Sequence, residues 1–120
     1  MVRTAASGGA QVIMLPEMFV CPYMGKYMLE NAEPVNEKDI ASSGETTQLL
    51  SSLAKETGTY IIGGSIPEQI PGEQKIFNTC LCFDKDGQIK ASHRKLHLFD
   101  VNIPGGVVFF ESNYCKPGPA

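Results

Sequence analysis

The sequence lacks a long apolar run, an excess of basic residues and closely spaced cysteine pairs, and each lack excludes a class of protein. No apolar run approaches the roughly 20 residues that a membrane-spanning helix needs, and no apolar segment follows Met1 as a secretory signal requires. A net charge of −3 gives no general attraction to nucleic acid or to an anionic membrane surface. We therefore expect neither nucleic acid nor a membrane as a partner.

Cysteine and histidine are too sparse to predict a disulfide scaffold or a metal site. The four cysteines lack the dense spacing of small secreted domains, and no Cys-x-x-Cys pair indicates structural zinc. His93 and His97 would share one face of a helix, but their surroundings favour a strand and no third ligand is evident. We expect reduced thiols, no bound metal and a cytosol-like compartment.

The length and the hydrophobic pattern predict one small α/β domain with a mixed sheet. The chain has 120 residues, of which 42% are hydrophobic and 19% charged, as in ordinary soluble domains. Apolar residues at helical spacing predict a helix over Thr46–Thr57 that ends at Gly58, and the start of the chain reads as the end of another helix. Apolar runs predict strands over Gln11–Leu15, Thr59–Ile66, Ile76–Phe83 and Gln88–Arg94, the last two joined as a hairpin, with a loop from Pro67.

The stretch His93–Gly105 draws attention to Lys95. Polar and apolar residues alternate there, which predicts an extended segment with one buried face that closes in a turn at Pro104 and Gly105. A lysine in such a segment is partly desolvated, and Asp100 follows it. Lys95 is therefore a candidate for a fixed positive charge beside a reaction centre.

Glu17 is the candidate acid. It directly follows the predicted strand Gln11–Leu15, at the strand end where ligands gather in sheets packed with helices. Apolar neighbours predict a desolvated carboxylate with a raised pKa, which could act as a general base. A structural ion pair with Lys95 is an equally good interpretation of the pattern.

A thiol would complete an acyl-transfer site, but no cysteine in this sequence is a convincing nucleophile. Cys21 lies in a predicted loop, Cys80 and Cys82 alternate within a predicted strand, and Cys115 lies in a tail rich in proline and glycine. The predicted site is therefore incomplete.

Four blocks in the same order resemble the carbon–nitrogen hydrolases of the nitrilase superfamily, and most of all their omega-amidase branch, also called nitrilase-like protein 2. The blocks are LPEMFVCPY (15–23), GGSIPE (63–68), FNTCLCFDKDG (77–87) and HRKLHLFDVNIPG (93–105). The resemblance runs from about Gly9 to Glu111 and implies a four-layer α-β-β-α sandwich, of which residues 1–120 are the N-terminal portion. It implies a Glu-Lys-Cys triad that needs neither a metal nor an organic cofactor.

The resemblance also implies the roles of individual residues. Glu17 matches the general base, and Lys95 matches the cation that stabilises the oxyanion. Glu111 matches a second glutamate that orders the lysine and the substrate, and Tyr23 matches a tyrosine that shapes the substrate pocket. The family's nucleophilic cysteine lies at a strand end well beyond the position of Glu111-Ser112. Cys115 falls where the family has an ordinary loop residue. Gly106-Val107 replaces a Gly-Lys pair that is common in the branch.

We therefore expect a domain truncated at both ends. In the complete protein we expect an amidase that releases ammonia from small ω-amides of α-keto dicarboxylic acids, such as α-ketoglutaramate and α-ketosuccinamate. The chain alone should be inactive, with an exposed apolar sheet face and poor solubility. Two other interpretations stay open, an inactive regulatory or interaction subunit and a small binding domain. The resemblance further implies a homodimer, a role in nitrogen metabolism, and a cytoplasmic location with the mitochondrion as a second compartment.

Overall fold

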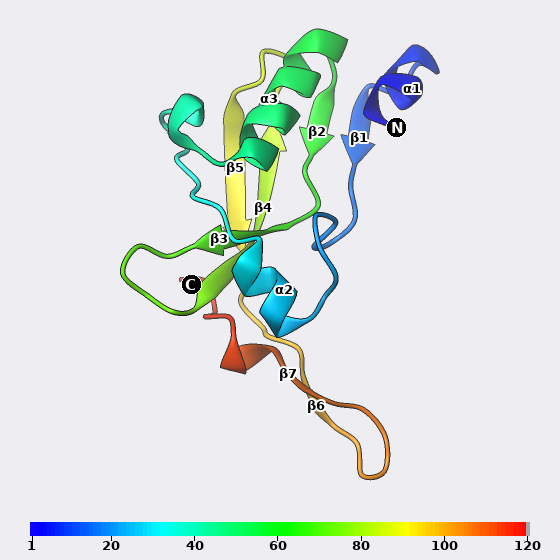
Figure 1. The fold of residues 1–120 in the computed structure, drawn as a ribbon. Coiled ribbons are helices and arrows are strands. Elements are labelled where there is room, and N and C mark those ends of the chain that lie inside the picture. The colour runs from blue at the N-terminus through cyan, green and yellow to red at the C-terminus, as the bar shows by residue number, and fades with distance from the viewer. Residues whose placement is uncertain (120) are drawn as a thin grey trace.

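The computed structural model of the chain describes residues 1–119 as a mixed β-sheet with helices packed on one face (Figure 1). In chain order the elements are α1 (Val2–Ser7), β1 (Val12–Met14), α2 (Gly25–Glu30), the 3₁₀ helix Ile40–Ser42, α3 (Glu45–Thr57), β2 (Tyr60–Ile62), β3 (Ile66–Gln69), β4 (Ile76–Phe83), β5 (Ile89–Arg94), β6 (Asp100–Asn102), β7 (Val108–Phe110) and the 3₁₀ helix Glu111–Asn113. The predicted α/β class with a mixed sheet is confirmed.

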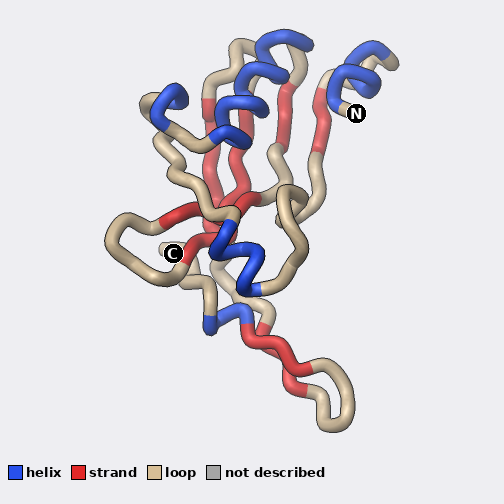
Figure 2. The backbone as a smooth tube through the Cα atoms, in the orientation of Figure 1, coloured by secondary structure: helices blue, strands red, loops and turns tan. Residues whose placement is uncertain are grey.

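Strand β4 is the centre of the sheet. Strand β5 pairs antiparallel with one edge of β4, and β2 and β3 pair antiparallel with successive halves of its other edge. Strand β1 pairs parallel with β2. A separate two-stranded sheet of β6 and β7 projects from the body and lengthens the molecule to 47 Å (Figure 2).

The predicted single strand over Thr59–Ile66 is wrong in one respect, because it is two strands, β2 and β3. Between them the backbone turns at Gly64, whose φ of 59° lies in the left-handed region that favours glycine. Pro67 and Glu68, predicted to begin a loop, lie in β3. Strands β2 and β3 therefore run in the same direction along one edge of β4, with a register shift of one residue at the break.

Helices α1 and α3 cover one face of the sheet and enclose the main core. Ile13, Ile61, Leu81 and Phe83 point from neighbouring strands toward this side, as the strand register requires. The buried residues Leu50, Leu53 and Ala54 of α3 pack on them, together with Val2 of α1. The 3.6-residue period of α3 matches this single buried face.

The opposite face of the sheet has no layer on it within residues 1–119. We call it the open sheet face, formed by Val12, Met14, Tyr60, Ile62, Cys80 and Cys82. Val12 is 56% exposed and Met14 is 72% exposed, although both lie in a strand beside the buried Ile13. The predicted exposed apolar sheet face is confirmed. None of the helices in these residues is both long and apolar enough to cross a bilayer.

Neighbouring residues of β1 should therefore respond differently to substitution. We expect Ile13→Ala to lower the free energy of unfolding by about 2 to 4 kcal/mol, because it leaves a cavity in the core. We expect Met14→Gln to change it by less than about 0.5 kcal/mol and to reduce self-association. Urea unfolding and sedimentation velocity of the purified chain measure both effects. An equal loss of stability in the two variants would contradict a free open sheet face.

Candidate active site

Lys95 lies at the centre of the polar cluster that the sheet brings together. It follows the last residue of β5, and its backbone N–H donates to the carbonyl of Asn78 in β4 at 2.9 Å. Its ammonium group has three N–H bonds and three oxygen partners: Glu111 Oε2 at 2.9 Å, the Tyr23 hydroxyl at 3.0 Å and Glu17 Oε1 at 3.2 Å. Every N–H of the ammonium group is therefore used within the chain.

Glu111 is the buried acid of the cluster. Its side chain is 0% exposed, and both of its oxygens accept hydrogen bonds. Oε2 accepts from Lys95 and from the backbone N–H of Phe99 at 2.6 Å, and Oε1 accepts from the Tyr23 hydroxyl at 2.7 Å. Burial alone would raise the pKa of Glu111, but the hydrogen bonds from Phe99, Tyr23 and Lys95 outweigh it and hold this pKa below its usual value.

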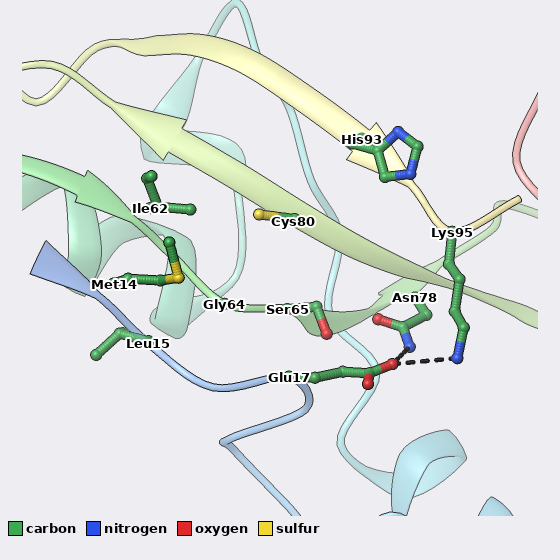
Figure 3. Close-up of a pocket in the computed structure, with 10 residues that line it drawn as sticks. All are labelled: Met14, Leu15, Glu17, Ile62, Gly64, Ser65, Asn78, Cys80, His93 and Lys95. Carbon is green, nitrogen blue, oxygen red and sulfur yellow. Dashed lines mark hydrogen bonds and ion pairs between the residues drawn. The ribbon is translucent and has the colours of Figure 1, made fainter.

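Glu17 is the exposed acid of the cluster. Its side chain is 51% exposed, so the predicted desolvation of this carboxylate is wrong. Its hydrogen bonds from Asn78 Nδ2 at 2.7 Å and from Lys95 Nζ at 3.2 Å both go to Oε1 (Figure 3). The Tyr23 hydroxyl lies 3.1 Å from the same oxygen. Within residues 1–119, Oε2 of Glu17 has no hydrogen-bond partner and is the oxygen left free to accept a proton.

The turn between β2 and β3 holds the backbone of Glu17 in place. Ser65 accepts a hydrogen bond from the Met18 N–H through Oγ at 3.0 Å, and it donates its own N–H to the Pro16 carbonyl at 3.3 Å. Gly64 lies so close to the backbone of Pro16 that a Cβ added to the glycine would be 2.0 Å from the Pro16 carbonyl oxygen. Met18 itself has a φ of 49°, a rare value for a residue with a side chain. Two segments far apart in the sequence thus fix the direction of Glu17.

Tyr23 and Asn78 connect the two acids. The Tyr23 hydroxyl has one proton, and the shorter of its two carboxylate distances places that proton on the bond to Glu111. Burial is the main cause of the raised pKa of Tyr23, so the hydroxyl stays protonated. Asn78 is buried and donates to Glu17 at 2.7 Å, with longer contacts of 3.4 Å to Tyr23 and Glu111.

Lys95 is a stable cation in this setting. Desolvation would lower the pKa of Lys95, but its hydrogen bonds to Tyr23, Glu111 and Glu17 reverse that effect and raise it above its usual value. Asp100, the carboxylate that follows Lys95 in the sequence, accepts instead from the Ser112 N–H at 3.0 Å. The ammonium group therefore keeps its charge across the neutral range.

Three of the four cysteines have thiols whose pKa lies above its usual value. Burial raises the pKa of Cys80 to about 11 and that of Cys115 to about 12, and it raises the pKa of Cys21 as well. Figure 3 shows the Cys80 sulfur pointing away from Glu17 and Lys95. Cys115 is buried and pairs with Ile76 of β4, so the tail rich in proline and glycine is attached to the sheet at this residue. All four cysteines are free thiols.

A cleft of about 350 Å³ extends from the cluster across the open sheet face. Met14, Ile62 and Cys80 form its apolar floor, and Glu17 and Lys95 lie at one end (Figure 3). In the described part of the chain, no three or more His, Cys, Asp or Glu side chains come together in a group that could hold a metal ion. A half-buried cation, an exposed base and a neighbouring cleft together suit acyl-transfer chemistry, provided that a nucleophile reaches the open sheet face.

Comparison with known proteins identifies the family of this chain. The family described as carbon-nitrogen hydrolase matches residues 1–120. The chain belongs to the carbon-nitrogen hydrolase family. Among curated relatives, omega-amidase NIT2-B of Xenopus laevis is 48% identical over 118 residues, which cover 98% of this chain and 40% of that protein. Human omega-amidase NIT2 is 47% identical over 117 residues, which cover 98% of this chain and 39% of that protein. The chain thus spans about 40% of the length of these relatives.

Solved structures confirm the predicted fold of the nitrilase superfamily. Nit3 of Saccharomyces cerevisiae, a member of branch 10 of that superfamily, matches with a TM-score of 0.75 and 30% identity, covering 99% of this chain and 42% of that one. The C. elegans NitFhit protein matches with a TM-score of 0.77 and 26% identity, and the match covers 99% of this chain and 28% of that one. The helix layer and mixed sheet of this carbon-nitrogen hydrolase chain are consistent with the expected α-β-β-α sandwich.

The structure brings together all four residues that the resemblance singled out, namely Glu17, Tyr23, Lys95 and Glu111. Their catalytic roles stay predictions. Sequence reasoning missed Asn78, although it lies in one of the four blocks. A polar residue inside an otherwise apolar strand was the available signal, because a buried amide needs partners.

Gly64 gives the first test of how Glu17 is held. We expect Gly64→Ala to cost at least about 3 kcal/mol of unfolding free energy, since the new Cβ meets the Pro16 carbonyl oxygen. Gly72→Ala is the matched control, because Gly72 also has a positive φ, of 77°, but has open space around it. It should cost only about 1 kcal/mol. Similar losses for the two variants in urea unfolding would show that Gly64 does not need its close contact.

Glu111 gives a prediction of pH dependence. Its pKa is lowered in the folded chain, so its stabilising contribution is complete above its ordinary value of 4.5 and is lost as the pH falls through the folded value. We expect Glu111→Gln to be less stable than the wild type near neutral pH and to lose less stability between pH 6 and about pH 3. Asp84→Asn is a second case, because Asp84, in the β4–β5 turn, also has a lowered pKa, so its removal should likewise reduce the stability lost on acidification. Urea unfolding at several pH values measures this, and equal acid sensitivity in the wild type and Glu111→Gln would refute it.

Proposed function

We propose that this chain contributes the base and the cation of an omega-amidase that hydrolyses small ω-amides of α-keto dicarboxylic acids. α-Ketoglutaramate and α-ketosuccinamate are the substrates we propose, and ammonia and the keto acid are the products. Similarity to the omega-amidases of frog and human supports the substrate class. The convergence of Lys95 with Glu17 and Glu111 supports the chemistry and is the observation that carries the proposal.

In this proposal the nucleophile is a cysteine outside these 120 residues. Glu17 takes the thiol proton, and the thiolate attacks the amide carbonyl to give a tetrahedral oxyanion. When the intermediate collapses, the C–N bond breaks and the nitrogen leaves as ammonia with the proton from Glu17. Water then attacks the thioester, so that the acid and the free thiol are released. No metal or organic cofactor takes part in this sequence.

The hydrogen bonds of the cluster support separate roles for its two acids. Oε2 of Glu17 has no partner within residues 1–119 and can accept the thiol proton, whereas both oxygens of Glu111 are occupied. All three N–H groups of Lys95 are already used, so none can bind the oxyanion until one of the existing hydrogen bonds weakens. Protonation of Glu17 removes the charge from the partner at 3.2 Å, the longest of the three contacts. One N–H of Lys95 is then released as the oxyanion forms, so the cation acts in the transition state and not before.

An inactive subunit is the second candidate. The protonated thiols of this chain and its open sheet face favour it, because they describe a domain that needs another polypeptide segment to act. In that case the chain would bind a full-length relative and alter its activity. Homodimer formation and the cytoplasmic or mitochondrial location stay predictions.

A chimera tests the proposed function. The 120 residues are joined to the part of Xenopus laevis omega-amidase NIT2-B that follows the matched stretch, and ammonia release from α-ketoglutaramate is measured. We expect turnover that falls by roughly a thousandfold or more in Glu17→Gln and Lys95→Met. Lys90→Met, at an exposed position of β5, should stay within about twofold. Full activity of the Lys95→Met chimera would end the proposal.

The chain alone is the second arm of the experiment. We expect no ammonia release above the buffer rate, because burial raises the pKa of Cys21, Cys80 and Cys115 and keeps these thiols protonated near neutral pH. Turnover by the chain alone that Cys21→Ala or Cys115→Ala abolishes would show that the nucleophile lies within these residues. Inhibition or activation of a full-length relative by the chain, without turnover of its own, would favour the inactive subunit.

A further inference from the structure

We propose that the ion pair of the buried Glu68 and the half-buried Arg94 is a positioning device for Lys95. The two residues are on strands β3 and β5, which are not neighbours, since both pair with β4. Arg94 donates through Nε to Glu68 Oε2 at 2.7 Å and through Nη2 to Oε1 at 2.6 Å. The bidentate pair therefore links β3 to β5 across β4, at the last residue before Lys95.

The surroundings of Glu68 leave it little freedom. Its side chain is buried, and Oε2 also accepts from the Thr79 hydroxyl at 2.6 Å. The Arg94 guanidinium lies 5.3 Å from the centre of the Phe77 ring, on the same face of β4. Planar, bidentate pairing fixes the orientation of the guanidinium as well as its distance from the carboxylate. The Arg94 side chain is therefore held in a single conformation.

The order Arg94-Lys95 turns this restraint into a direction for the lysine. Consecutive residues of an extended chain point to opposite faces of a sheet. Arg94 is paired with Thr79 on the helix-covered face, and Lys95 lies beside Asn78 on the other face. The Lys95 carbonyl also accepts from the Gly118 N–H at 2.9 Å. Holding the guanidinium on one face therefore presents the ammonium to Glu17 and Glu111 on the other.

Stability alone does not account for such a pair. Burying an ion pair costs desolvation energy that its attraction often only offsets, and apolar residues of similar volume commonly do as well. The chain itself offers a comparison, since its only other arginine, Arg3, makes a bidentate pair with Glu56 at 2.6 and 2.8 Å. That pair is solvent-exposed and joins α1 to α3, far from Lys95 in the fold.

Acetylation of individual lysines tests the proposal on the intact chain. Acetic anhydride reacts with the unprotonated amine, and mass spectrometry reports each lysine separately, with the exposed Lys55 of α3 as the reference. In the wild type we expect Lys95 to react at least roughly tenfold more slowly than Lys55, because one unit of pKa changes the unprotonated fraction tenfold. We expect Glu68→Gln to speed Lys95 by roughly tenfold relative to Lys55. Glu56→Gln, the matched control, should leave the ratio within about twofold.

Arg94→Lys keeps the charge and removes the planar fork, so it should release Lys95 in the same way. An unchanged Lys95 ratio in either folded variant would overturn the proposal. Unfolding of both variants, seen by circular dichroism, would also overturn it, because the pair would then hold the whole fold and not the lysine. The inference rests on the role proposed for Lys95, but acetylation does not depend on amide hydrolysis. If the chimera is inactive but the variants change the acetylation rate of Lys95 as expected, only the proposed function is refuted. If the chimera is active but the variants leave the acetylation rate of Lys95 unchanged, only the positioning role is refuted.

Discussion

The cluster depends on one shared cation, the ammonium group of Lys95. It balances the carboxylate of Glu111, which has no exposed surface and would be very costly to bury without a charged partner. Two carboxylates and one ammonium leave one negative charge over, and this charge falls on Glu17, the acid that water can solvate. The same ammonium connects residues from opposite ends of the chain, so the arrangement forms only when the sheet has formed.

The two glutamates differ in what surrounds them and not in their chemistry. Glu111 accepts hydrogen bonds on both oxygens, and one donor is the backbone N–H of Phe99, which cannot rotate away. Glu17 receives all its donors on a single oxygen and faces the cleft on the open sheet face. A saturated, buried carboxylate suits a fixed charge, and a half-solvated one with a free oxygen suits proton transfer. The cluster therefore separates structural and reactive roles by the placement of donors.

The sequence predicts much of this arrangement, and the failures have physical causes. Glu17 and Lys95 could be found because each follows a recognisable strand, and Glu111 and Tyr23 because they fall in blocks that resemble a family. The break between β2 and β3 was missed, since the strand pattern continues through Gly64, and only the left-handed φ of this residue interrupts the pairing with β4. The exposure of Glu17 and the burial of Cys115 depend on which elements pack nearby, and local pattern does not contain that information. Asn78 was missed because its side-chain partners come from two distant segments, Glu17–Tyr23 and the region of Glu111.

The alternation of side chains along β4 and β5 explains how a thin sheet can hold so many polar groups in fixed positions. On the helix-covered face, Thr79 and Arg94 satisfy the buried Glu68. One residue along each strand, Asn78 and Lys95 face the other way and satisfy Glu17. A slip of the β4–β5 register by one residue would exchange the two sets, leaving Glu68 without its arginine and Glu111 without its lysine. The buried charges on the two faces thus reinforce a single register, and that register is what brings the ammonium group to both acids.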